Sequence, residues 1–96
     1  FITVMKKRVH AFYSGRVQGI GFRMTAEETA RDLGIFGWIK NLRDGRVELI
    51  AEAEQETLER FLREIQIGSL KNFITQVEVS WSSATDTFEE FEIRYY

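Results

Sequence analysis

Residues 14–23, with the sequence SGRVQGIGFR, decide the fold because they separate a strand pattern from a helix pattern. Just before them, apolar residues alternate with more polar ones from Val9 to Tyr13, which predicts a strand over residues 8–14. Just after them, apolar residues recur at helical spacing, which predicts a helix that stops near Gly34. Three glycines within seven residues give the backbone the freedom that a tight strand-to-helix turn requires.

The rest of the chain contains one more helix pattern and several more strand patterns. The turn signal Asp44-Gly45 stands between an apolar, aromatic stretch over residues 35–41 and a new alternation from Val47, which predicts a β-hairpin. A second helix is indicated by apolar residues at positions i, i+3, i+4 and i+7, with Gly68 just past its end. The helix positions are Leu58, Phe61, Leu62 and Ile65. Two later alternations indicate further strands, the first with Val77, Val79 and Trp81 and the second with Phe91, Ile93 and Tyr95.

The predicted order of elements is β-α-β-β-α-β with a short extra C-terminal strand. Because crossover connections are right-handed, both helices are expected on one face of a mostly antiparallel sheet. This is an α+β architecture, the ferredoxin-like α/β sandwich, and we expect residues 1–96 to form a single such domain. Residues 1–4 are expected to be a non-native or upstream extension that precedes Met5. Because this fold carries many unrelated functions, the function must be inferred from a site.

The composition of the 96 residues excludes several kinds of chemistry. With no cysteine, the chain has no disulfide, thiolate metal site or cysteine nucleophile, and one histidine, His10, cannot form a multi-histidine site. No apolar run approaches the ~20 residues that span a bilayer, and no secretory signal is recognisable, so we expect a cytoplasmic location. Residues 1–50 hold nine Lys or Arg against five Asp or Glu, so an anionic ligand is expected on this half.

The glycine-rich stretch has the composition of an anion site. Successive backbone N–H groups in such a turn can face one point at a helix N-terminus, where a phosphate-sized anion binds well. Arg23 falls in the first turn of the predicted helix, and its planar guanidinium group could reach two oxygens of that anion. A turn that serves only tight packing is the alternative interpretation. The glycine spacing matches neither of the common nucleotide-binding loops.

A second informative segment covers residues 37–45, with the sequence GWIKNLRDG. Asn41 falls at the end of the predicted strand, just before the hairpin turn. Asparagine at such a position often has only a turn or capping role. Alternatively, its carboxamide, which offers a donor and an acceptor together, could hold and orient a water molecule.

These two segments together resemble the acylphosphatase family. The similarity extends from about Val9 to Tyr95 and includes the closing residues FEIRY. The resemblance implies a hydrolase that cleaves the carboxyl–phosphate anhydride bond of acyl phosphates without a metal ion or cofactor. It also implies a small-molecule partner, the acyl phosphate, with inorganic phosphate or sulfate as a competing anion. No nucleic acid or membrane partner is expected, and we expect a monomer.

The resemblance also implies a role for individual residues. Arg23 matches the family's phosphate-binding arginine, and Asn41 matches the asparagine that orients the attacking water. The phosphate-binding loop of the family matches Gly15, Arg16, Val17, Gln18, Gly19 and Ile20. The chemistry is compatible with these residue types, because an acyl phosphate has a good leaving group and needs mainly positioning and positive charge.

Two other protein classes share the predicted element order. An RNA-binding module needs stacking aromatic residues on its central strands, but residues 46–51, RVELIA, contain none. A metal chaperone of this fold needs a cysteine pair, which the sequence lacks.

A subtler alternative is the acylphosphatase-like domain at the N-terminus of larger hydrogenase-maturation proteins. In those domains a proline comes directly after the loop arginine, whereas Met24 comes after Arg23 in this sequence. This difference favours the free-standing enzyme.

Overall fold

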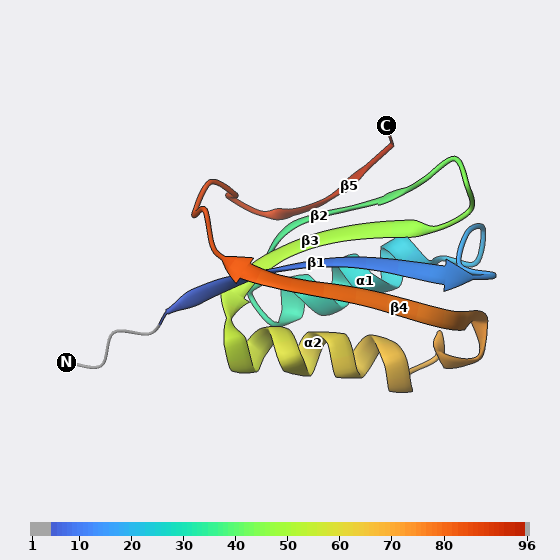
Figure 1. The fold of residues 1–96 in the computed structure, drawn as a ribbon, viewed down its shortest axis with the longest axis horizontal. Helices are drawn as coiled ribbons and strands as arrows, with labels where there is room; N and C mark the ends of the chain where they lie inside the picture. Colours follow the sequence, from blue (N-terminus) through green and yellow to red (C-terminus); the bar gives the residue numbers. More distant parts are fainter. Residues whose placement is uncertain (1–4, 96) are drawn as a thin grey trace.

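Five strands of one sheet, two α-helices and a short 3₁₀ helix account for most of residues 5–95, the part of the chain that the computed structural model describes (Figure 1). The expectation for residues 1–4 lies outside the described residues. Neither α-helix in this part is long and apolar enough to cross a membrane. The elements are β1 Lys6–Gly15, α1 Phe22–Asp32, β2 Phe36–Asn41, β3 Val47–Glu54, α2 Gln55–Ile67, η1 Lys71–Phe73, β4 Ile74–Ser83 and β5 Phe91–Arg94.

The strands are arranged in the order β4-β1-β3-β2-β5. Strand β1 pairs antiparallel with β3 and β4, and β2 pairs antiparallel with β3. The added strand β5 runs parallel to β2 at the opposite edge from β4. The predicted ferredoxin-like architecture, with its short extra strand and mostly antiparallel sheet, is therefore confirmed.

The hydrophobic core lies between one face of the sheet and the two helices. The register places Val9 opposite Ala51 and Ala11 opposite Leu49, and all four side chains are buried. Because side chains alternate along a strand, these residues share one face. The helices contribute buried residues from the predicted stripes to the same cluster, namely Phe22, Ala26 and Ala30 from α1 and Leu58, Phe61, Leu62 and Ile65 from α2.

Hydrogen bonds to the buried carboxylate of Glu52 hold the segment that leads to β5. Strands β4 and β5 lie at opposite edges of the sheet, so residues 84–90 must pass the ends of the strands between them (Figure 1). Glu52, on the face opposite the helices, is only 5% exposed. Its carboxylate accepts hydrogen bonds from the Thr85 and Asp86 backbone N–H groups at 2.9 and 3.0 Å. The Thr85 hydroxyl and Arg8 Nε donate to it as well, at 3.0 and 2.7 Å.

These contacts predict a specific contribution of Glu52 to acid stability. Burial raises the pKa of Glu52, but the hydrogen bonds from Thr85, Arg8 and Asp86 outweigh it and hold the pKa below its ordinary value. A folded-state pKa below the unfolded value of about 4.3 means that ionised Glu52 stabilises the fold above that pH. This contribution is lost as the pH falls through the folded-state pKa.

We therefore expect Glu52→Gln to lower the free energy of unfolding at pH 7 by about 1–3 kcal/mol, because the amide leaves some donors unpaired. Urea unfolding between pH 7 and pH 3 should also show a flatter pH dependence in this variant than in the wild type. The control is Glu78→Gln, a substitution at an exposed position on β4. Equal acid slopes for the wild type and Glu52→Gln would contradict this role of the carboxylate.

Candidate active site

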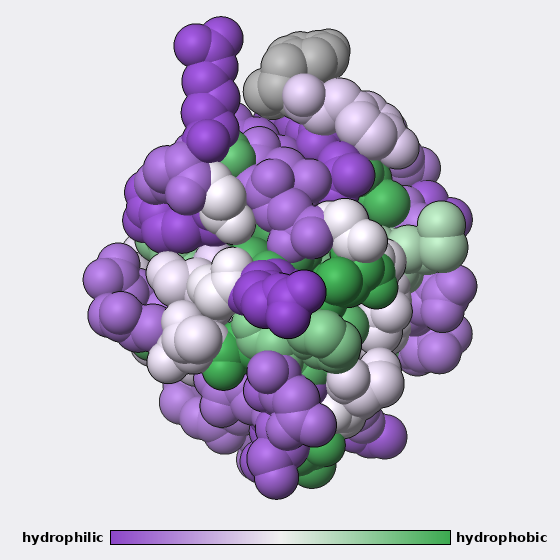
Figure 2. Space-filling model, turned by 90° about the vertical axis from the view of Figure 1, so that its right-hand side faces the viewer, coloured by the Kyte–Doolittle hydropathy of each residue, from purple (hydrophilic) through white to green (hydrophobic). Residues whose placement is uncertain are grey.

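The residues singled out by the sequence meet at one end of the sheet. The loop between β1 and α1, the end of β2 and the end of β5 all reach this end of the molecule (Figure 1). A depression of about 150 Å³ lies among them. Figure 2 faces this end and shows strongly hydrophilic and hydrophobic residues close together on its surface. The lining residues are Val17, Gly19, Gly21, Phe22, Arg23, Met24, Asn41, Ile93 and Tyr95.

The loop supplies backbone donors that have no partner. Among the described residues, the N–H groups of residues 17–21 donate to no backbone or side-chain acceptor. Gly19 and Gly21 have φ angles of 79° and 81°, a left-handed conformation that glycine adopts without strain. Gly21 is the N-cap of α1 and gives the helix no side-chain cap. Free N–H groups beside the positive end of a helix dipole make this loop suited to bind an anion.

Arg23 adds a full positive charge to the same depression. It is the second residue of α1, and no carboxylate within residues 5–95 forms an ion pair with it. Its guanidinium carbon lies 5.1 Å from the centre of the Tyr95 ring, so the aromatic face supports the cation. A cation in the first turn of a helix opposes the helix dipole. An anion bound in the depression would balance both charges.

Asn41 brings an unpaired polar atom to the depression. It is the last residue of β2, and its Oδ1 is buried without a hydrogen-bond partner among the described residues. Leaving a buried acceptor unpaired costs about 1–3 kcal/mol, so such a group requires an explanation. A water molecule held at Oδ1 would satisfy it.

Two close contacts with the backbone carbonyl oxygen of Phe73 fix the start of the loop. Gly15 has a φ angle of 124°, and a Cβ atom there would lie 2.3 Å from the carbonyl oxygen of Phe73. The Arg16 N–H donates to that same oxygen at 2.9 Å. Glycine is therefore required at position 15 for packing. The Arg16 N–H already has a partner, unlike the N–H groups that follow it.

Gln18 joins the loop to the hairpin. Its Nε2 donates to the carbonyl oxygens of Leu42 and Arg46, at 2.7 and 2.9 Å. These acceptors flank the turn that follows Asn41, so one side chain links the segment of Arg23 to the segment of Asn41. Gln18 and Ile20 do not line the depression, and Ile20 instead packs against the core.

The depression also has an apolar part that the sequence did not single out. Met24, Ile93 and Tyr95 line it beside Arg23 and Asn41. The alternation of Phe91, Ile93 and Tyr95 indicates a strand but does not say which strand it pairs with. The parallel pairing of β5 with β2, in which Arg94 lies opposite Lys40, places Tyr95 at the same end of the sheet as Asn41.

Beneath the loop, Tyr13 supports the start of α1. Its ring centre lies 5.1 Å from that of Phe22, and both side chains are buried. Burial raises the pKa of the Tyr13 phenol above its ordinary value, so this side chain stays neutral. It therefore provides packing for the loop and no charge to the site.

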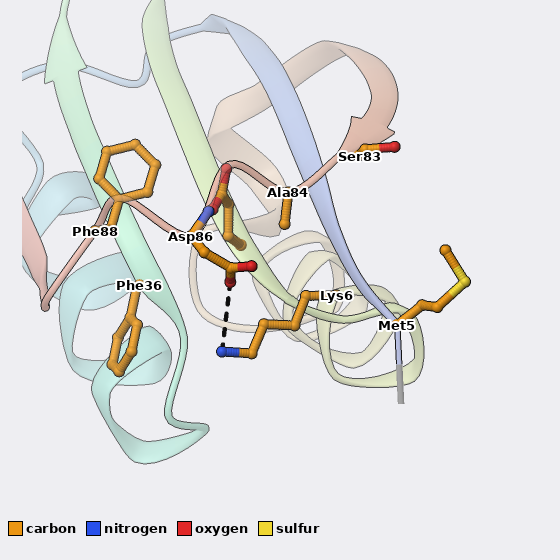
Figure 3. A pocket seen from close by; sticks show the side chains of 8 residues that line it. Met5, Lys6, Phe36, Ser83, Ala84, Asp86 and Phe88 are labelled. Carbon is orange, nitrogen blue, oxygen red and sulfur yellow. Dashed lines mark hydrogen bonds and ion pairs between the residues drawn. The ribbon is translucent and has the colours of Figure 1, made fainter. Parts of the chain in front are cut away.

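A second groove, of about 560 Å³, is a poor site for an anion. It lies among Met5, Lys6, Phe36, Glu52, Ser83, Ala84, Asp86 and Phe88 (Figure 3). Two of these residues are carboxylates, and the Nζ of Lys6 lies 3.6 Å from the Asp86 carboxylate, as Figure 3 shows. Because Lys6 is paired with Asp86 and Arg8 with Glu52, the described residues of this groove offer phosphate no excess positive charge.

The family model and similar sequences agree on one family. The acylphosphatase family model matches residues 9–93. The acylphosphatase of Salinibacter ruber is 41% identical over 92 residues, which cover 96% of this chain and 97% of that protein. The acylphosphatase of Methylococcus capsulatus is 40% identical over 87 residues, with coverages of 91% and 95%.

Solved structures show the same likeness. The crystal structure of the Bacillus subtilis acylphosphatase matches with a TM-score of 0.86 and 34% identity, over 93% of this chain and 99% of that chain. Full-length HypF matches with a TM-score of 0.84 over 97% of this chain, but at 21% identity and over 12% of its own chain. The likeness to HypF therefore concerns the fold alone.

The contacts of Gln18 predict a positioning role for its side chain. We expect Gln18→Ala to weaken phosphate binding about three- to tenfold, and to cost about 1–2 kcal/mol of stability, because the carbonyl oxygens of Leu42 and Arg46 each lose one of two donors and keep only a backbone N–H of the turn. Isothermal titration with inorganic phosphate and urea unfolding measure the two effects. Gln66→Ala, at an exposed position on α2, is the matched control. Unchanged phosphate affinity in Gln18→Ala would show that the loop keeps its shape without this link.

Proposed function

The chain belongs to the acylphosphatase family, and on this premise we propose that its depression hydrolyses the carboxyl–phosphate anhydride bond of acyl phosphates. One observation carries the proposal: within residues 5–95, the unpaired loop N–H groups, the Arg23 guanidinium group without an ion-pair partner and the unpaired Asn41 carboxamide oxygen belong to residues that line or adjoin one depression. Phosphate oxygens are acceptors and can pair with the N–H groups and the guanidinium group. A water molecule can donate a hydrogen bond to the carboxamide oxygen.

The phosphoryl group would bind in the loop. The N–H groups of residues 17–21 donate to its non-bridging oxygens, and the two ends of the Arg23 guanidinium group can donate to two of these oxygens at once. Charge develops on these oxygens in the transition state of phosphoryl transfer. Donors that are already in place stabilise this charge without reorganisation, so the rate increases.

Asn41 would orient the attacking water. As the water oxygen bonds to phosphorus, the bond from phosphorus to the acyl oxygen breaks, and its electron pair leaves with the carboxylate. Both protons of the water end on the phosphate product: one stays on the attacking oxygen and the other moves to a non-bridging oxygen. Because a carboxylate leaves without needing a proton, no strong general acid is required. His10 is not involved, since its Nε2 lies 2.6 Å from Glu48 Oε2 and outside the depression.

From the same residues we also propose which anions compete with the substrate, that no metal ion is needed, and the oligomeric state. Inorganic phosphate and sulfate offer the same tetrahedral set of acceptors and compete with the substrate. Arg23 and the loop supply positive charge at the phosphoryl group, so the reaction needs no metal ion. All of these groups come from one chain, so a monomer is sufficient for the reaction that we propose.

We expect Arg23→Gln to abolish phosphate binding and to lower the turnover of benzoyl phosphate by at least about 100-fold, because the fixed charge is lost. Hydrolysis is followed by ultraviolet absorbance in excess chelator, and the wild type should be fully active there. Arg63→Gln, at an exposed position on α2, is the control. Near-normal turnover in Arg23→Gln would refute the assigned role.

Asn41→Ala separates binding from chemistry. We expect turnover to fall by about 100-fold while the affinity for inorganic phosphate changes little, because the carboxamide orients water and does not hold the phosphoryl group. Turnover and calorimetric phosphate titration give the two values, with Asn72→Ala on η1 as the control. Loss of phosphate binding together with turnover would make Asn41 a structural residue.

A further inference from the structure

Positive charge gathers at the end of the molecule that carries the loop. Three segments reach this end: residues 14–23 with the loop, residues 41–47 with the hairpin turn, and residues 66–76 with η1 (Figure 1). They contain five Lys or Arg but a single carboxylate, that of Asp44. Because the whole chain has thirteen Lys or Arg and fifteen Asp or Glu, the rest of it has eight basic and fourteen acidic residues. A protein with a net charge of −2 therefore has one strongly basic end.

Four of the five cations at this end have no ion-pair partner among residues 5–95. The exception is Arg46, whose Nε lies 2.7 Å from the Asp44 carboxylate, so this pair carries no net charge. The unpaired cations are Arg16, Arg23, Arg43 and Lys71. Of the eight basic residues elsewhere, only Lys7 and Arg63 lack a partner in this part of the chain. Unneutralised positive charge is therefore concentrated around the loop.

Arg43 and Lys71 flank the loop without lining the depression. Arg43 lies in the hairpin turn directly after Leu42, whose carbonyl oxygen accepts a hydrogen bond from Gln18 of the loop at 2.7 Å. Lys71 lies on η1, two residues before Phe73, whose carbonyl oxygen accepts a hydrogen bond from a loop N–H group at 2.9 Å. Both side chains are exposed, and neither residue lines the depression. Separate backbone contacts thus hold one cation on the hairpin side of the loop and one on the η1 side (Figure 1).

From this arrangement we propose that Arg43 and Lys71 attract the anionic substrate toward the loop without contacting it. The field of fixed surface charges raises the local concentration of an oppositely charged ligand, and such guidance increases association rates by about 10- to 1,000-fold. Because the phosphoryl group carries negative charge, the two cations increase the affinity of the site and leave the chemical step unchanged. This proposal rests on the proposed function, since it concerns how the same ligand reaches the same loop.

The charges at the opposite end of the sheet give the attraction a direction. Residues 84–90, which connect β4 to β5 there, contain three carboxylates and no Lys or Arg. The nearby cations Lys6 and Arg8 are already paired with Asp86 and Glu52. An anion that approaches the molecule is therefore attracted at the loop end and not at the other end.

Removal of either charge tests the proposal. We expect Arg43→Gln and Lys71→Gln each to weaken binding of inorganic phosphate about two- to fourfold at about 20 mM salt, because one unit charge acts on the anion through water. At about 0.5 M salt both variants should match the wild type, because the screening length falls from about 20 Å to about 4 Å. Calorimetric titration gives these affinities.

Two control variants remove the same amount of charge away from the loop. Arg63 is an unpaired cation that lies beside Asp32 at the C-terminal end of α1, and Lys7 is an unpaired cation near the start of β1. We expect Arg63→Gln and Lys7→Gln to bind phosphate like the wild type at both salt concentrations. A loss in the controls as large as in Arg43→Gln and Lys71→Gln would show that net charge matters and that the position of the charge does not, which would overturn the proposal.

Arg43→Lys separates charge from contact. This variant keeps the positive charge but lacks the planar guanidinium group, so it should keep the wild-type affinity for phosphate. With benzoyl phosphate, we expect Arg43→Gln to raise KM at low salt and to leave kcat unchanged. A loss that persists at about 0.5 M salt, or that Arg43→Lys shares, would overturn the proposal, because guidance by charge is screened by salt and needs no particular cation.

Guidance by charge and the proposed function fail on different results. If the wild type hydrolyses no acyl phosphate but both Gln variants bind phosphate more weakly at low salt alone, the guidance stands and the proposed function fails. If the wild type hydrolyses benzoyl phosphate but Arg43→Gln and Lys71→Gln bind phosphate as tightly as Arg63→Gln, the guidance is wrong and the proposed function stands.

Discussion

Two hydrogen bonds from the Gln18 carboxamide hold the candidate site together. They join a glycine-rich loop to a hairpin whose acceptors lie 24 and 28 residues further along the chain. Besides these bonds, the segment that carries Arg23 and the segment that carries Asn41 are related through the packing of α1 on β2 and β5. Catalysis by positioning depends on such links, because a displacement of about 1 Å can cost about 100-fold in rate. The loop can keep its own N–H groups unpaired because a side chain, and not its backbone, makes the connection.

The far end of the sheet contributes to the site through β5. Glu52 fastens residues 85 and 86 where the chain passes from one edge of the sheet toward the other. The strand that follows then runs parallel to β2 and brings Ile93 and Tyr95 to the depression. Glu52 thus holds the segment that precedes β5, the strand that leads to Tyr95. In the nearby groove Lys6 and Arg8 are paired with Asp86 and Glu52, whereas Arg23 has no ion-pair partner among the described residues.

Local patterns in the sequence were sufficient to predict the fold. The alternation from Val9 to Tyr13 and the helical stripe of α2 depend on neighbours in the chain, and both predictions were confirmed. Arg23 and Asn41 could be singled out because their positions relative to a turn are also local, and their chemical roles stay predictions. By contrast, the bonds of Gln18, the burial of Glu52 and the stacking of Tyr95 on Arg23 join residues distant in the chain. No local pattern indicates such contacts, since they depend on strand order and on parallel pairing of β5.

We expect phosphate to bind at the loop between β1 and α1, beside Arg23 and Asn41. Titration of the ¹⁵N-labelled protein with inorganic phosphate, followed by amide chemical shifts, tests it directly. We expect the largest shifts at the N–H groups of residues 17–23 and at the Asn41 side chain, with little change at Glu52 and Asp86. Shifts centred on the groove beside Glu52 and Asp86, or spread evenly over the whole surface, would contradict phosphate binding at this loop.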